Sequence, residues 1–193
     1  MLYICPMRPQ KILEEEIIAG LTKVFRAKGY EGASLQELAK ITGLKKASLY
    51  HRFPEGKQGM ALAVITHLDN WVEEHVFREL LDENSTPQLR LKKGLGNINK
   101  LYDDGKEGCI FNALSMETGL DLFEEQIKNG MKKWIDTFKE VGVAFNLSSH
   151  DAKEHALRNL IEIQGSLIVS KALGDFTIFQ DTIQNIENRY LGA

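Results

Sequence analysis

The sequence predicts an all-α protein in which a small N-terminal helix-turn-helix unit precedes a larger helical body. Apolar residues recur at helical spacing along the chain, and alternating apolar strands are absent. Residues 34–57 read as two short helices joined by a glycine turn and followed by a helix start. The charge divides in the same way, because residues 1–67 carry a net +4 and residues 68–193 a net −7. We expect about nine helices and a domain boundary near residue 56.

Composition narrows the classes of protein further. The chain has 193 residues, of which 43% are hydrophobic, so it can bury a sizeable core. Two cysteines and five scattered histidines offer no disulfide framework and no metal-ligand spacing. A nucleophile elbow and a glycine-rich phosphate loop are missing too. These features predict no catalytic residues, no metal and no cofactor.

The opening residues 1–5 are apolar, but Pro6 and Arg8 interrupt them at once. The run is too short for a signal peptide, and Met7 offers a second candidate start. No apolar run approaches the ~18 residues that a transmembrane helix needs. We therefore expect a cytoplasmic protein without a membrane partner.

The first domain is predicted from local signals. A helix over residues 9–28 ends at Gly29, and Ser34 with Glu37 forms a capping box that opens the next helix. Gly43 provides the turn, and a short third helix spans residues 45–53.

A fourth helix over residues 57–81 follows, about 35 Å long at ~1.5 Å per residue. That length is sufficient to link two bodies mechanically. Turn and capping residues then separate five further expected helices, over residues 87–102, 109–117, 121–143, 150–173 and 175–190.

The third helix has the composition of a nucleic-acid reader. Leu49 and Phe53 face inward, and acidic residues are missing between Glu37 and Glu55. Lysine, arginine, serine, tyrosine and histidine suit phosphates and base edges, and Ala47 allows the backbone to approach closely. The alternative is an ordinary solvated helix face, which would usually include acids. The outward-facing residues are Lys45, Lys46, Ser48, Tyr50, His51 and Arg52.

These motifs together resemble the TetR family of one-component repressors. The likeness covers about 55 residues and rests on Phe25-x-x-x-Gly29-Tyr30, Ser34-Leu35-x-Glu37-Leu38-Ala39 and the run from Gly43 to Phe53. The segment Phe53-Pro54-Glu55-Gly56-Lys57 is one residue longer than the commonest form and is similar to a multidrug-responsive, LmrA-like subgroup.

The resemblance implies a homodimer whose paired recognition helices bind a palindromic double-stranded DNA operator. It assigns residues 1–56 to DNA binding and 57–193 to effector binding and dimerisation. Ser34 would meet a phosphate at its helix N-terminus, and Lys57 would clamp another. The implied DNA-binding residues are Ser34, Lys45, Lys46, Ala47, Ser48, Tyr50, His51 and Lys57.

Aromatic and apolar residues are plentiful in the body, where they could form either core or the lining of a ligand cavity. The resemblance implies a small-molecule effector of unknown identity in this region. Cys109 opens a helix, so it is either a core thiol or a sensor of oxidants or electrophiles. The candidate effector-binding residues are His67, Trp71, Cys109, Phe111, Asn112, Met116, Met131 and Trp134.

The last two helices are apolar on more than one side, which favours a dimer interface over a larger monomer core. The candidate interface residues are Leu160, Ile163, Gln164, Leu167, Ile168 and Ile183. The expected protein is a ligand-responsive repressor that a small effector releases from DNA. A thiol-sensing repressor acting through Cys109, or an activator with the same fold, is the alternative.

Overall fold

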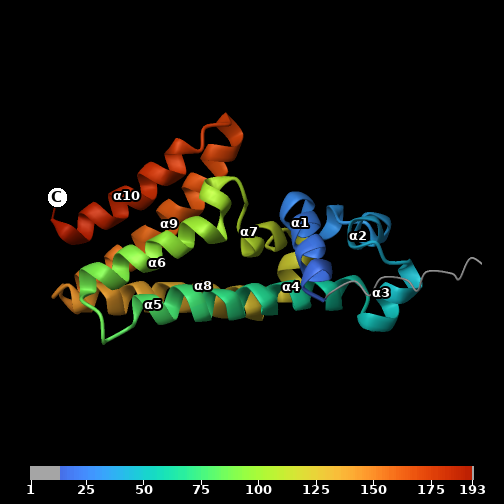
Figure 1. Cartoon of the computed structure of the whole chain (residues 1–193), viewed down its shortest axis with the longest axis horizontal. Helices are drawn as coiled ribbons and strands as arrows, with labels where there is room; N and C mark the ends of the chain where they lie inside the picture. The colour runs from blue at the N-terminus through green and yellow to red at the C-terminus, as the bar shows by residue number, and fades with distance from the viewer. Residues whose placement is uncertain (1–13, 193) are drawn as a thin grey trace, which may run out of the picture.

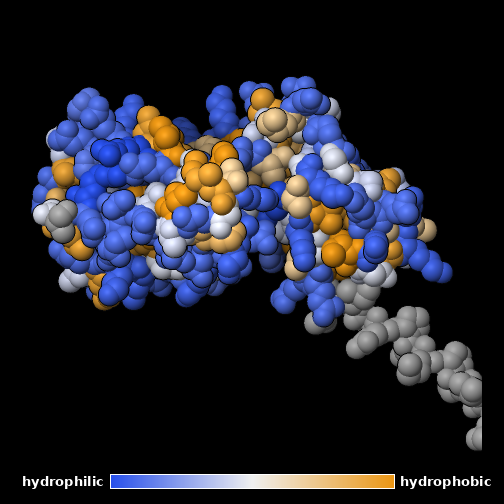
Figure 2. Space-filling view, turned by 90° about the horizontal axis from the view of Figure 1, so that it is seen from above, coloured by the Kyte–Doolittle hydropathy of each residue, from blue (hydrophilic) through white to orange (hydrophobic). Residues whose placement is uncertain are grey.

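The computed structural model describes residues 14–192, and all regular structure in that range is helical (Figure 1). The opening segment, with Cys5 and the second candidate start Met7, lies outside the described residues. Helices α1 (Glu14–Gly32), α2 (Leu35–Thr42) and α3 (Lys46–Arg52) form one end of the molecule. The remaining helices form the body, and Figure 2 shows a constriction between the two parts.

The N-terminal unit follows the predicted local signals. Ser34 Oγ accepts the backbone N–H of Glu37, and the Glu37 carboxylate accepts that of Ser34, which completes the capping box. Gly43 ends α2 in the left-handed conformation, with φ 67°. Leu38 of α2 and Leu49 of α3 are fully buried, and α2 packs on both α1 and α3.

Helix α4 (Lys57–Val72) runs from this unit into the body beside α8 (Figure 1). It continues through a π-helical turn, η1 (Glu73–Phe77), into α5 (Arg78–Leu80). The predicted helix over residues 57–81 is therefore continuous, but its π turn was not expected. Asn97 Nδ2 donates to the His75 carbonyl across 2.6 Å, so a side chain of the next helix binds the backbone of this turn.

The body contains α6 (Pro87–Leu101), a 3₁₀ turn η2 (Asp103–Gly105), α7 (Ile110–Leu114), α8 (Glu117–Ala144), α9 (Ser149–Leu173) and α10 (Thr177–Leu191). Helix α7 is shorter than the predicted helix over 109–117, because the chain leaves helical geometry at Ser115 and Met116. Helix α8 begins earlier than expected and includes a non-helical residue at Phe123, with φ −123° and ψ 16°.

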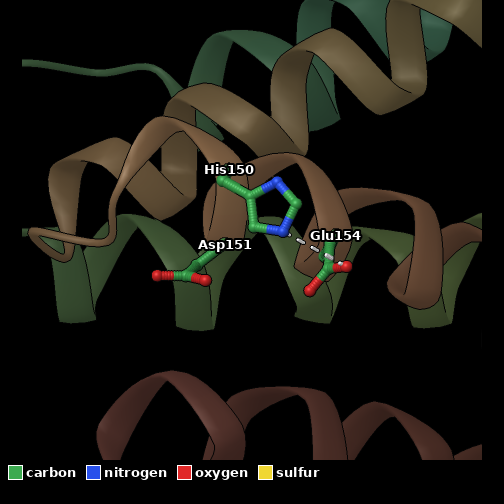
Figure 3. A group of neighbouring side chains, drawn as sticks. All are labelled: His150, Asp151 and Glu154. Carbon is green, nitrogen blue, oxygen red and sulfur yellow. Dashed lines mark ion pairs between the residues drawn. The ribbon is translucent and has the colours of Figure 1, made fainter.

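Helix α9 begins with a polar turn of His150, Asp151 and Glu154 (Figure 3). His150 Nε2 lies 3.5 Å from a Glu154 carboxylate oxygen, and the Asp151 N–H donates to Ser148 Oγ across 3.1 Å. All three side chains are exposed, and the N-terminal cap of α9 is Ser148, which accepts the Asp151 N–H.

One hydrophobic core extends from α1 through the body to α10. Its largest fully buried side chains come from both parts, with Phe25 on α1, Phe123 and Phe138 on α8, and Phe179 on α10. Along residues 14–192, no helix combines the length and the apolar character needed to cross a bilayer.

Candidate nucleic-acid interface and effector pocket

The outer face of α3 lies at the end of the molecule away from the body (Figure 1). Leu49 is its buried anchor, and the other residues of the helix are exposed. Residues Leu44, Ala47, Ser48, His51 and Arg52 line a shallow groove on this face. Ser34, at the N-terminus of α2, is exposed as well. Of the predicted reading residues, Ala47, Ser48 and His51 therefore lie together in this groove, and Ser34, Lys45, Lys46 and Tyr50 are exposed.

The charge of Glu37, an acid on α2, is neutralised locally. Glu37 pairs with Lys28 and accepts a hydrogen bond from Ser34 Oγ across 2.9 Å. Lys28 first, and then Ser34, hold the pKa of Glu37 at about 2. Because the Glu37 carboxylate is paired with Lys28 and bonded to Ser34, it adds little repulsion toward a polyanion.

Lys57, the predicted phosphate clamp, contacts Tyr30 in this structure. Its Nζ donates to the Tyr30 carbonyl across 2.8 Å and lies 4.3 Å from the centre of the Tyr30 ring. Gly29 interrupts α1 just before Tyr30, and carbonyls at a helix end need an outside partner. In this structure Lys57 joins the start of α4 to the end of α1, and a phosphate would have to compete with Tyr30 for it.

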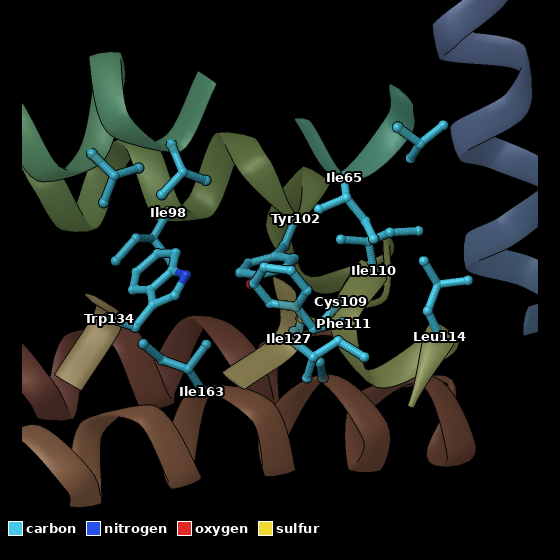
Figure 4. Close-up of a cluster of buried hydrophobic side chains, with 14 of the residues drawn as sticks. Ile65, Ile98, Tyr102, Cys109, Ile110, Phe111, Leu114, Ile127, Trp134 and Ile163 are labelled. Atoms are coloured by element: carbon cyan, nitrogen blue, oxygen red, sulfur yellow. The ribbon is translucent and has the colours of Figure 1, made fainter. Parts of the chain in front are cut away.

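The predicted effector residues separate into three groups. Cys109, Phe111 and Trp134 are buried and, with Tyr102, line a void of about 20 Å³ (Figure 4). Met131 packs half-buried against the same core. His67 and Trp71 line a different groove, between α1, α4 and α6.

Asn112 and Met116 are exposed, so the structure does not support them as pocket residues. Met116 is 64% exposed because α7 ends just before it and the chain turns outward. Asn112 follows the buried Phe111 and lies about 100° further round the helix, away from the core.

A larger pocket of about 280 Å³ adjoins the void and shares Asp69, Val72 and Trp134 with it. Its remaining lining comes from η1 and α8, namely Phe77, Gln126, Asn129, Gly130 and Lys133. A Cβ at Gly130 would lie 2.3 Å from Phe111 Cζ, so the glycine lets that ring pack against α8 and occupy the interior. The sequence reading missed Asp69 and Lys133. The signal for Asp69 was an acid between the apolar residues Leu68 and Val72 of one helix.

Asp69 titrates unusually. Although the residue is exposed on its outer side, desolvation at the pocket raises the pKa of its carboxyl group to about 6, and Lys133 partly opposes this. The folded state therefore favours the protonated acid, and the wild-type chain loses stability as the pH rises from about 4 to about 6.

We expect the variant Asp69→Asn, which stays neutral, to become more stable relative to the wild type as the pH rises through that range. Urea unfolding measures the difference in the free energy of unfolding, which should change little further at higher pH. Lys133→Gln should raise the pKa of Asp69 further and extend the loss to higher pH. A constant difference between Asp69→Asn and wild type from pH 4 to pH 7 would show that the pocket does not desolvate this carboxyl group.

Cys109 occupies the position of a core thiol. It is 6% exposed and stands at the N-cap of α7 without a side-chain capping bond. Burial, with Cys109 as a neighbour, raises the pKa of the Tyr102 hydroxyl well above its usual range. Tyr102 is therefore a neutral hydrogen-bonding group in the interior.

Most of the predicted dimer residues are buried within the single chain. Leu160, Ile163, Leu167 and Ile183 are at most 7% exposed and belong to the core of the single chain. Gln164 is half-buried, and Ile168 is 55% exposed. The exposed apolar side chains of α9 are Leu157, Ile161, Ile168, Val169 and Leu173, which we call the α9 stripe.

Comparison with known proteins gives the same assignment as the geometry. The family "Bacterial regulatory proteins, tetR family" matches residues 17–64, which span α1 to the first part of α4. The chain is 29% identical over 171 residues to an uncharacterised helix-turn-helix regulator, YxaF, of Bacillus subtilis, covering 84% of this chain and 87% of the relative. It is 24% identical over 160 residues to the transcriptional regulator LmrA of the same organism, covering 81% and 85%.

Solved structures share the fold at low identity. A TetR transcriptional regulator from Legionella pneumophila aligns with a TM-score of 0.78 and 18% identity, covering 94% of this chain and 99% of that one. A cysteine mutant of the TetR family regulator CifR, complexed with 26-base-pair operator DNA, aligns with a TM-score of 0.74, 18% identity and coverages of 94% and 98%. The family match over residues 17–64 and the two regulators of Bacillus subtilis identify the chain as a member of the TetR family of DNA-binding transcriptional regulators.

Proposed function

We propose that the protein is a ligand-responsive repressor that binds a palindromic operator as a homodimer and leaves it when a small effector binds the body. The observation that carries the DNA-reading part is α3, a helix with one buried residue and a polar, basic outer face. Such a face can insert into a major groove, where lysines meet phosphates or guanine edges. The operator complex of CifR, which has a similar fold, supports this choice.

The α9 stripe supports the dimer. Five large apolar side chains, between 45% and 70% exposed, follow one another along a single helix. Gly165 lies among them, and a Cβ placed there would meet nothing within 4 Å. Since the single chain does not require this glycine, a closely packed partner helix is a physical reason for it. A second copy of α9 would cover the stripe around a two-fold axis.

The void and its adjoining pocket support the effector site. Their lining residues come from α1, α4, η1, the α6 end, the start of α7, and α8, so a ligand there would touch the helix that leads to the DNA-binding unit. A ligand larger than the void would displace lining side chains such as Phe111 or Trp134, and residues of α4 line both cavities. Movement of α4 would change the separation of the two recognition helices, which must match one helical turn of DNA, about 34–36 Å.

Two substitutions on α3 test the DNA-reading part. Lys46→Ala and Tyr50→Ala should each weaken operator binding by about 1–3 kcal/mol, because they remove a contact to phosphate or base without touching the core. Both side chains are exposed, so thermal unfolding should stay at the wild-type value. The measurement is fluorescence anisotropy with an operator selected from random DNA by the wild-type protein.

Lys128→Ala, which removes an exposed lysine of α8, is the matched control and should bind like wild type. If Lys46→Ala and Tyr50→Ala bound the selected operator as tightly as Lys128→Ala does, α3 would not be the reading helix.

A further inference from the structure

A second cavity lies between the two parts of the molecule, and its lining shares Arg26, Leu68 and Leu101 with that of the void. It is an open groove of about 470 Å³ between α1, α4 and the C-terminal end of α6. Its polar lining is mainly basic, with Lys23 and Arg26 from α1 and Lys100 from α6. Glu107 is the single acid in the lining. The groove therefore combines an excess of positive charge with a junction between the DNA-binding unit and the body.

Arg26 is the unusual member of this lining. Its side chain is 10% exposed, and it reaches across the junction to the body. Nη2 donates to the Leu101 carbonyl across 3.4 Å, and Nη1 lies 3.8 Å from a Glu107 carboxylate oxygen, so both contacts are long. Nε is buried and has no partner among the described residues. A buried guanidinium left with unsatisfied donors is costly, and a bound anion would satisfy them.

The groove also offers an apolar wall. Ala19, Leu68 and Leu101 contribute to it, and the Trp71 indole is half-buried there. Trp71 is held in place by the His75 ring, which stacks on it with centroids 4.6 Å apart. A fixed aromatic surface beside a cluster of cations suits a ligand with a flat apolar part and one anionic group.

We propose that this groove binds a small organic anion, specifically a carboxylate carried on an aromatic or compact apolar body. The carboxylate pairs with Arg26, takes the place of Glu107, and is flanked by Lys23 and Lys100. The apolar body lies against Trp71. The site adds a ligand class to the protein, and the inference does not rest on the proposed function, because the groove is lined by the same residues whether or not the chain represses a gene.

Benzoate is the probe, and benzamide is its neutral counterpart of the same shape. The full-length protein is titrated with each while the two indole N–H signals are followed by NMR. Trp71 reports on the groove, and Trp134 reports on the effector pocket, so the two sites are read separately. We expect benzoate to shift the Trp71 signal saturably with a Kd of roughly 1 mM, as befits so small a ligand. Benzamide should bind at least about tenfold more weakly, because it cannot neutralise the guanidinium.

Three variants identify the contacts. Arg26→Lys keeps the charge but loses the planar fork, and it should weaken benzoate binding about tenfold. Lys23→Gln combined with Lys100→Gln should weaken it about fivefold, through surface changes that leave Arg26 in place. Lys92→Gln, an exposed lysine of α6 outside the groove, is the control and should bind like wild type. If Arg26→Lys does not fold, the double lysine variant alone decides the question.

Equal binding of benzoate and benzamide, a shift of Trp134 alone, or a double lysine variant that binds like Lys92→Gln would each overturn the proposal and leave Arg26 with a purely structural role. Operator binding by the ligand-free protein is measured in parallel. Its failure would reject the proposed function and would leave the result for the groove standing.

Discussion

Replacing Ile161 and Ile168 together by glutamate is expected to convert the protein to a monomer and to lower operator affinity by about 100-fold or more. The two side chains are 60% and 55% exposed in the single chain, so the substitutions should cost the fold little. Across a two-fold axis they would place four carboxylates in an apolar interface, where charges are costly without partners. A monomer contacts only one half-site. It loses the increase in affinity that comes from linking two binding units, which is typically 10²–10⁴-fold.

Sedimentation equilibrium gives the oligomeric state, and anisotropy with the full and half operators gives the affinity. Leu89→Glu is the control, since Leu89 is 46% exposed on α6, away from the α9 stripe. The control should stay dimeric and bind normally, and the double variant should bind the half operator as well as wild type does. A double variant that sediments as a dimer would show that another surface joins the two chains.

The N-terminal unit could be predicted from the sequence because its determinants are local. The capping box uses residues three apart, and Gly43 and Leu49 follow it by six and twelve residues. Each feature depends on neighbours along the chain, so one sequence is sufficient to place it. The contact between Lys57 and Tyr30 could not be predicted in this way, because the two residues are 27 apart and the Tyr30 carbonyl becomes available only when α1 is interrupted at Gly29.

The dimer face and the effector residues depend on tertiary packing. Helix α9 is apolar on two sides, and the sequence does not say which side faces α8 and α10. The predicted set centred on Leu160 and Ile163 is the side that the chain itself buries, and the stripe through Ile161 and Ile168 is left exposed. In the same way, Phe111 of α7 is buried and the next residue, Asn112, is exposed. A helix of five residues is too short for the sequence to predict which of its sides faces the core.

The junction between the two parts rests on the end of α1 as well as on α4. Tyr30 lies against Phe25 and against Phe123, which is the non-helical residue of α8. The Gly119 N–H donates to a Glu31 carboxylate oxygen across 3.0 Å. These contacts require the chain to change direction at Gly29, which has φ 68° and ψ −172°. A signal that reaches α7 or the start of α8 therefore meets the DNA-binding unit directly, without passing along α4.

Gly29→Ala is expected to lower the free energy of unfolding by about 3 kcal/mol. The backbone angles at this position are almost exclusive to glycine, which accounts for roughly 1–3 kcal/mol of strain. A Cβ would also lie 2.8 Å from the Ala113 carbonyl oxygen, so α1 and α7 would have to move apart. Urea unfolding followed by circular dichroism measures the change. Gly96→Ala is the matched control, because a Cβ there meets nothing within 4 Å.

The control lies inside helix α6, where alanine is favoured over glycine by roughly 0.5–1 kcal/mol, so Gly96→Ala should stabilise the protein. The two substitutions add the same methyl group. A loss of stability at Gly29 and a gain at Gly96 would therefore be due to the backbone conformation and the close contact at the junction. Equal stability changes for both variants would mean that the interruption of α1 at Gly29 is not required by the packing of α1 on α7. In that case α4 alone would have to carry any signal from the body to the recognition helix.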